Sequence, residues 1–81
     1  MNEYAAVKKI IDEWDPIGLL KTGCPDDEYA PEIFDIVKLL PSVESADELA
    51  RGIRQVFKDW FAEYLAYEDC YSIAIEIWKH R

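Results

Sequence analysis

The connection over residues 14–29 constrains the fold more than any other stretch of this sequence. Asp15 precedes Pro16, and a residue before proline is pushed out of the α region of backbone space, so a helix that reaches Trp14 must end there. The segment 17–20 is largely apolar. Because loops are usually polar, we expect this segment to make a short helical turn and to fold back onto the core. The chain on either side must then form separate elements that pack together.

Apolar residues before and after this connection recur at the three- and four-residue spacing of amphipathic helices. The spacing predicts four helices, over residues 2–14, 27–40, 46–65 and 68–79. Pro31 is tolerated only in the first helical turn, so the second helix should begin within a residue or two of Ala30. Four short helices and no strand pattern predict an all-α fold. We expect a compact four-helix, partly orthogonal bundle.

The third helix should carry an apolar stripe close to half its circumference. Ser45 and Glu48 have the spacing of a capping box, in which the serine hydroxyl caps the first turn. Gly52 lies beside the apolar stripe, where another helix can cross closely. Most of the aromatic rings of this helix, Trp60 included, are expected in the core. The predicted stripe consists of Leu49, Ile53, Val56, Phe57, Trp60, Phe61 and Tyr64.

The last helix has an apolar face wider than one core contact needs. The pattern loses phase near Ala66, and a new stripe that includes Cys70 then begins. Tyr71 and Ile75 lie beside this stripe, and Trp78 ends it. An apolar face of this width predicts a contact with a second copy of the chain, through Tyr71, Ile75 and Trp78.

Length and charge limit the classes of function. At 81 residues the chain is expected to be a single domain, 1–81, because a chain this short has too little buried surface for two cores. It carries 17 acidic and 9 basic residues, for a net charge of −8. Nucleic acids and anionic membrane surfaces need clustered cations, so neither is an expected partner. A basic protein partner is compatible with this charge.

The lack of a recognisable targeting signal and the pattern of cysteines favour a cytoplasmic location. The N-terminal segment lacks the continuous apolar region of a signal peptide, and no apolar run approaches the length that spans a bilayer. Cys24 and Cys70 form no paired motif. We therefore expect a cytoplasmic protein with two free thiols.

Metal, cofactor and catalytic motifs are not apparent. The acidic cluster Asp26, Asp27 and Glu28 could offer oxygen ligands, but it lacks EF-hand spacing and is better explained by the positive end of a helix dipole. His80 is penultimate, a poor place for a general base. Cys70 lies on a core-facing stripe, which favours a buried thiol over a nucleophile. No catalytic residue, cofactor or metal ligand is assigned.

Three short segments carry a resemblance to a known family. The chain reads Trp-Asp-Pro-Ile at 14–17, Asp-Glu-Tyr at 27–29 and Val-Phe-Lys-Asp-Trp-Phe at 56–61. In these segments and their order it resembles the YugE-like proteins of Gram-positive bacteria, small proteins of unknown function. The resemblance implies a helical fold and no assigned activity, cofactor or catalytic residue. The region 15–29 also looks like a segment of small proteins suspected of toxin-immunity roles.

Together these features predict a non-enzymatic, protein-binding module. Under the first hypothesis an acidic surface with Asp15, Asp26, Asp27 and Glu28 binds a basic protein, as an immunity protein or regulator would. The second hypothesis is the homodimer described above. The third is a small-molecule enzyme that uses Asp15, Glu28 and Tyr29, which would require a cleft beside those residues.

Overall fold

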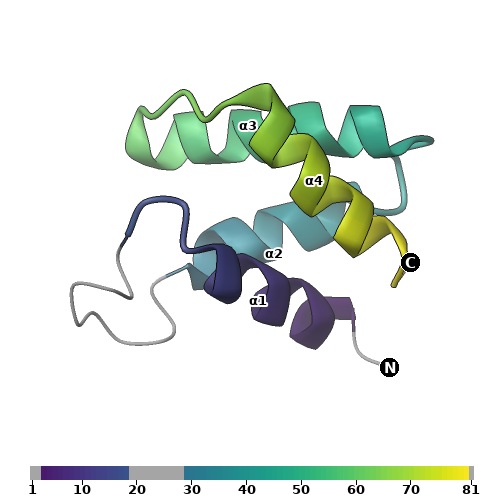
Figure 1. Ribbon diagram of the computed structural model, residues 1–81. Coiled ribbons are helices and arrows are strands. Elements are labelled where there is room, and N and C mark those ends of the chain that lie inside the picture. The colour runs from purple at the N-terminus through teal and green to yellow at the C-terminus, as the bar shows by residue number, and fades with distance from the viewer. Residues whose placement is uncertain (1–2, 19–28, 81) are drawn as a thin grey trace.

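The computed structural model describes residues 3–18 and 29–80 of the chain. These residues form four helices (Figure 1), α1 at Glu3–Trp14, α2 at Ala30–Leu39, α3 at Ala46–Phe61 and α4 at Tyr67–Trp78. The described part of the chain contains no strand. The predicted all-α, four-helix bundle is confirmed. No helix within it is long and apolar enough to cross a membrane.

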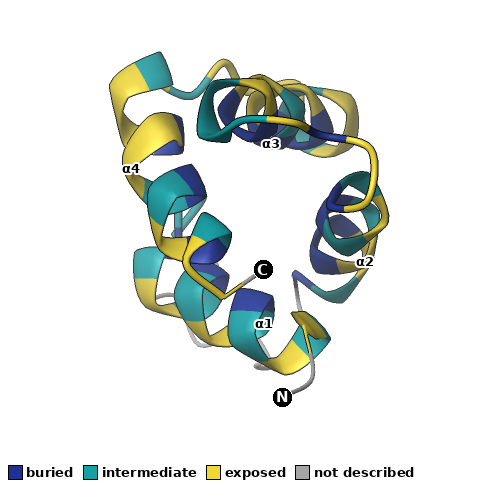
Figure 2. Ribbon diagram, turned by 90° about the vertical axis from the view of Figure 1, so that its right-hand side faces the viewer, coloured by how far each residue is buried: buried dark blue, intermediate teal, exposed yellow. Residues whose placement is uncertain are grey.

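The helices are arranged in a ring in which each contacts two neighbours. α1 packs on α2, α2 on α3, α3 on α4, and α4 returns to α1. Figure 2 shows that the buried sides of the four helices face a common centre. Aromatic rings cross this centre: Trp14 of α1 lies edge-on to Phe57 of α3, with 5.8 Å between ring centroids.

The centre is one continuous apolar cluster. It includes residues from all four helices and from the short links between them, and burial of this surface is the main force that holds helices of this length together. Its buried members are Val7, Ile11, Tyr29, Ile33, Ile36, Leu40, Val43, Leu49, Ala50, Ile53, Val56, Phe57, Cys70, Ala74 and Ile77.

The predicted start signals of α2 and α3 are confirmed. Pro31 lies in the first turn of α2, as its missing N–H requires. Tyr29 precedes that helix, with φ −93° and ψ 10°, so α2 begins later than the predicted residue 27. At α3 the Ser45 hydroxyl accepts a 3.2 Å hydrogen bond from the backbone N–H of Glu48. This contact caps the helix as the sequence predicts.

Gly52 marks the crossing of α2 and α3. A Cβ atom at this position would lie only 2.6 Å from Cδ1 of Leu39. The glycine therefore lets the Leu39 side chain approach the α3 backbone. The predicted close approach of another helix at Gly52 is confirmed.

α3 ends earlier than its apolar stripe predicts. Ala62 adopts a left-handed conformation, φ 57°, and its N–H donates to the Lys58 carbonyl at 2.8 Å. Such a residue terminates a helix, but it is usually glycine. Residues 62–66 then run without helical structure to α4. Because the helix stops, Tyr64 leaves the predicted stripe and is 68% exposed.

The core prediction for Trp60 is also wrong. This side chain is 52% exposed. Its indole Nε1 donates a 2.8 Å hydrogen bond to Oδ2 of Asp35 on α2. Trp60 lies at the edge of an apolar stripe that is nearly half the helix circumference wide. At this edge α2 contributes the Asp35 carboxylate as a hydrogen-bond acceptor and does not bury the indole ring.

Candidate functional site

Asp15, expected on an acidic surface that binds a basic protein, is turned into the protein. It is 8% exposed and has φ 46°. Its Oδ1 accepts a 2.6 Å hydrogen bond from the Tyr29 hydroxyl, which in turn accepts one from the Ile17 N–H at 3.2 Å. The Asp15 carboxylate is therefore directed at Tyr29. The other acidic candidates, Asp26, Asp27 and Glu28, lie outside the described residues, as do Leu19 and Leu20.

The proposed dimer residues differ in their exposure. Tyr71 is 38% exposed and stacks on Tyr67, with ring centroids 5.9 Å apart. Ile75 and Trp78 are half-buried, and Trp78 packs against the core. Tyr71 is thus the residue of this set that is most available to a second molecule.

A groove between α3 and α4 is lined by all three basic side chains of α3. Its volume is about 570 Å³. Arg51, Arg54 and Lys58 recur at spacings of three and four residues, so they share one face of the helix. We call this site the cationic groove, and its lining consists of Asp47, Arg51, Arg54, Gln55, Lys58, Tyr64 and Tyr67.

The early end of α3 shapes one wall of the cationic groove. Nε of Arg54 donates a 2.9 Å hydrogen bond to the Leu65 carbonyl, which ties the non-helical run to α3. The Tyr64 ring lies beside both cations, 5.6 Å from the Arg54 guanidinium carbon and 5.4 Å from Lys58 Nζ. Cations near an aromatic face are attracted by its quadrupole. These contacts hold the two charged groups along the groove.

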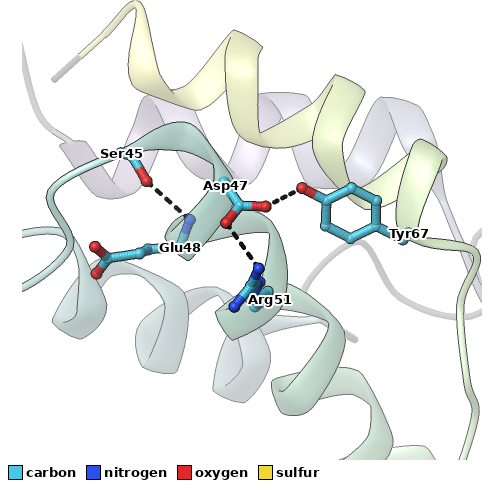
Figure 3. A network of polar contacts seen from close by, with 5 residues as sticks. All are labelled: Ser45, Asp47, Glu48, Arg51 and Tyr67. Carbon is cyan, nitrogen blue, oxygen red and sulfur yellow. Dashed lines mark hydrogen bonds and ion pairs between the residues drawn. The ribbon is translucent and has the colours of Figure 1, made fainter.

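Asp47 links the two helices at the other wall (Figure 3). One of its carboxylate oxygens lies 3.2 Å from an Arg51 nitrogen, and the other accepts a hydrogen bond from the Tyr67 hydroxyl. This hydrogen bond, with burial and the negative charge of Asp47, raises the pKa of Tyr67 above its usual range. Tyr67 therefore remains a neutral hydrogen-bond donor at physiological pH.

A second groove lies between α2 and α3 and has a volume of about 360 Å³. Its floor is apolar, and Gln55 lines it as well as the cationic groove. The lining consists of Asp35, Lys38, Leu39, Gly52, Gln55, Val56 and Asp59.

Two large aromatic side chains contact residues that line this second groove, Phe34 through Lys38 and Trp60 through Asp35. Phe34 is 56% exposed and Trp60 is 52% exposed. Lys38 connects them: its Nζ lies 5.0 Å from the Phe34 ring centroid and 3.6 Å from Asp35, the acceptor of the Trp60 indole. We call Phe34, Asp35, Lys38 and Trp60 the aromatic patch.

The described cysteine and the described acidic and histidine side chains form no reactive or metal site. Cys70 is buried, and this burial raises the pKa of its thiol to about 11. It is a free thiol held in the core, as the sequence predicts. Within residues 3–18 and 29–80 no three histidine, cysteine or acidic side chains are placed to hold a metal ion.

The fold defines a small all-helical domain with two surface grooves that share α3. Residues 6–79 match the family described as "Domain of unknown function (DUF1871)", and the chain belongs to that family. It is 34% identical over 77 residues to "Uncharacterized protein YugE" of Bacillus subtilis (strain 168), a match that covers 91% of this chain and 84% of the relative. The YugE-like resemblance is confirmed. No solved structure matches the chain.

Sequence reasoning missed both grooves. A signal was present for the cationic groove, since Arg51, Arg54 and Lys58 have helical spacing on one face. The overall charge of −8 concealed this local cluster. No comparable signal exists for the aromatic patch, because Phe34 and Trp60 are residues that normally indicate core.

Proposed function

We propose that this protein is a non-enzymatic binding module that docks a basic protein segment on the aromatic patch. The observation that carries the proposal is the exposure of Phe34 and Trp60 next to an apolar groove. Large exposed aromatic groups beside apolar surface are typical of protein interfaces, and tryptophan is enriched among the residues that dominate binding energy.

Charge supports a basic partner. Asp59 lines the groove and accepts a 2.8 Å hydrogen bond from Gln55, a neutral group, so its negative charge is not compensated by that contact. Asp35 contributes a second carboxylate, which Lys38 approaches at 3.6 Å. The net charge of −8 attracts cationic molecules over longer distances. This electrostatic contribution should act mainly on the association rate and fade as salt rises.

The test uses a photo-crosslinking amino acid placed separately at positions 34, 60 and 71. Tyr71 is the matched control because it is an exposed aromatic residue on α4. We expect one basic protein to be crosslinked from 34 and 60 in native lysate and not from 71. The crosslinked partner, once purified, should bind the wild-type protein in a salt-dependent manner. Its affinity for the Trp60→Ala variant should be at least about tenfold weaker. An acidic partner, or equal crosslinking from all three positions, would refute the proposal.

A homodimer through α4 is a second candidate, favoured by the exposure of Tyr71 and its stacking on Tyr67. Sedimentation equilibrium of the wild type and of Tyr71→Ala tests it. A dimer that weakens in the variant would support the α4 contact, and a monomer at high concentration would exclude it.

We also propose that the module acts in the cytoplasm. The free thiol of Cys70 is compatible with a reducing compartment. Fractionation of cells with an antibody to the protein tests this, and recovery outside the cytoplasm would contradict it.

A further inference from the structure

The cationic groove concentrates positive charge on an acidic protein. Arg51, Arg54 and Lys58 line it together with one carboxylate, that of Asp47. Asp47 forms its ion pair with Arg51. Among the residues that the structure describes, no ion pair joins Arg54 or Lys58 to a carboxylate. Three cations and one anion leave a local excess of two positive charges, opposite in sign to the protein as a whole.

The donors in the groove are suited to a phosphate group. The Leu65 carbonyl occupies Nε of Arg54 at 2.9 Å, which orients the guanidinium and leaves its terminal nitrogens for a ligand. A guanidinium presents paired donors that match the oxygens of phosphate, and an ammonium adds a compact charge. Lys58 lies four residues after Arg54 on the same helix face, and both cationic groups approach the Tyr64 ring.

Aromatic surface lines the same groove. Tyr64 is 68% exposed and lines the groove together with Tyr67, the first residue of α4, whose ring stacks on Tyr71. An exposed tyrosine ring beside cations is a surface on which the planar ring of a ligand can stack. The groove volume of about 570 Å³ is within the range of small-molecule sites.

The charge of the whole protein selects for a small ligand. A nucleic acid or a strongly acidic protein would extend beyond the groove and meet the field of a protein with net charge −8. A small anion remains inside the groove, and charges more than about 8 Å away are largely screened at physiological salt. We propose that the cationic groove binds a small phosphate ester that carries a planar ring, of the size of a mononucleotide. This site is separate from the aromatic patch and does not depend on the proposed function.

The test is calorimetric titration of the folded protein with AMP and ADP. Inorganic phosphate, which lacks the ring, and adenosine, which lacks the charge, are the reference ligands. We expect the nucleotides to bind at least about tenfold more tightly than either reference. Arg54→Gln and Lys58→Gln should each weaken nucleotide binding about tenfold, the loss expected for one charge-assisted contact. Asp47→Asn should strengthen it, because the one carboxylate of the groove is neutralised.

A matched control distinguishes the loss of a contact in the groove from a general change in net charge. Lys79→Gln removes the same charge from an exposed position at the end of α4 and should leave nucleotide affinity unchanged. All substituted side chains lie on the surface, and thermal melts of each variant verify folding. Absence of nucleotide binding would overturn the proposal, as would equal losses in Lys58→Gln and Lys79→Gln. Binding of a polyglutamate peptide or an oligonucleotide in preference to nucleotides would overturn the choice of a small ligand.

Discussion

The carboxylate of Asp15 accepts a 2.6 Å hydrogen bond from the hydroxyl of Tyr29, fourteen residues further along the chain. Both side chains are buried. The Tyr29 ring also lies edge-on to Phe57 and Phe61, at centroid distances of 6.0 and 6.4 Å. Tyr29 therefore joins the end of α1, the start of α2 and the C-terminal part of α3. An acidic residue in the first connection serves the fold through this contact.

Removal of the Tyr29 hydroxyl should lower stability measurably. We expect Tyr29→Phe to reduce the free energy of unfolding by about 2 kcal/mol, because a buried carboxylate loses a hydrogen bond while the ring remains. Chemical denaturation followed by circular dichroism measures the change. Asp15→Asn is the matched variant, since asparagine keeps an acceptor and tolerates positive φ. It should cost less than Asp15→Ala, and equal costs in the two variants would contradict this role of the side-chain acceptor.

Trp60 and Phe57 should differ strongly although both are aromatic residues of α3. Phe57 is 0% exposed, whereas Trp60 is 52% exposed. We expect Phe57→Ala to cost about 3 to 5 kcal/mol, as a core truncation does. Trp60→Ala loses a surface hydrogen bond and partial burial, for about 1 kcal/mol. Equal losses in parallel urea melts would place Trp60 in the core after all.

Local signals predicted where the first helix ends, where the second and third begin, and where two helices cross. Pro16, Pro31, Ser45 and Gly52 each act through their own backbone or side chain, so the sequence alone shows their effect. The end of α3 depends on Ala62 in a left-handed conformation. Alanine rarely adopts this conformation, so no sequence pattern predicts it here. The run that follows is held by contacts distant in sequence, such as that of Arg54 with the Leu65 carbonyl.

The candidate site depended on the same unpredicted turn. Helical spacing places Arg51, Arg54 and Lys58 on one face of α3, but a groove forms only because residues 62–66 leave the helix and bring Tyr64 and Tyr67 beside that face. Had α3 continued to residue 65 as predicted, Tyr64 would have remained on its apolar stripe. The cations could be predicted from the sequence, but the enclosing wall could not.

The close crossing at Gly52 predicts coupling with Leu39. Alanine at position 52 should favour the helix by about 1 kcal/mol, but its Cβ would meet Leu39 Cδ1 at 2.6 Å. The end of the leucine side chain can move, so we expect Gly52→Ala alone to change stability little. In a Leu39→Ala background the same substitution should stabilise by about 1 kcal/mol. A double-mutant cycle measures this difference, and identical effects in both backgrounds would refute the contact.

The thiol of Cys70 should be unreactive in the folded protein. Burial raises its pKa to about 11, so almost no thiolate is present at neutral pH. We expect iodoacetamide to label Cys70 only in denaturant, at a rate that follows unfolding. Mass spectrometry of the peptide that contains Cys70 keeps this signal apart from that of Cys24. Labelling of the native protein as fast as the denatured one would show that the thiol is accessible.

Alkaline pH should disrupt the contact between Tyr67 and Asp47. The pKa of Tyr67 is raised above its ordinary value of 10.0, first by the hydrogen bond to Asp47, then by burial and by the charge of that carboxylate. A group whose pKa is higher in the folded state stabilises the fold fully below its unfolded pKa, and this contribution is lost as pH rises through the folded pKa. The stability of the wild type should therefore fall more steeply above about pH 10 than that of Tyr67→Phe.

Ultraviolet absorbance of the phenolate measures the titration of Tyr67 directly. The wild type should contain a late-titrating tyrosine that is absent from Tyr67→Phe. In Asp47→Asn this tyrosine should titrate earlier, because the asparagine retains an acceptor but removes the negative charge that opposes deprotonation. The order of the three titrations tests whether Asp47 controls Tyr67, and a wild-type curve that matches Asp47→Asn would contradict it. The same substitution removes the one carboxylate that lines the cationic groove, so its effects on nucleotide affinity and on Tyr67 should appear together.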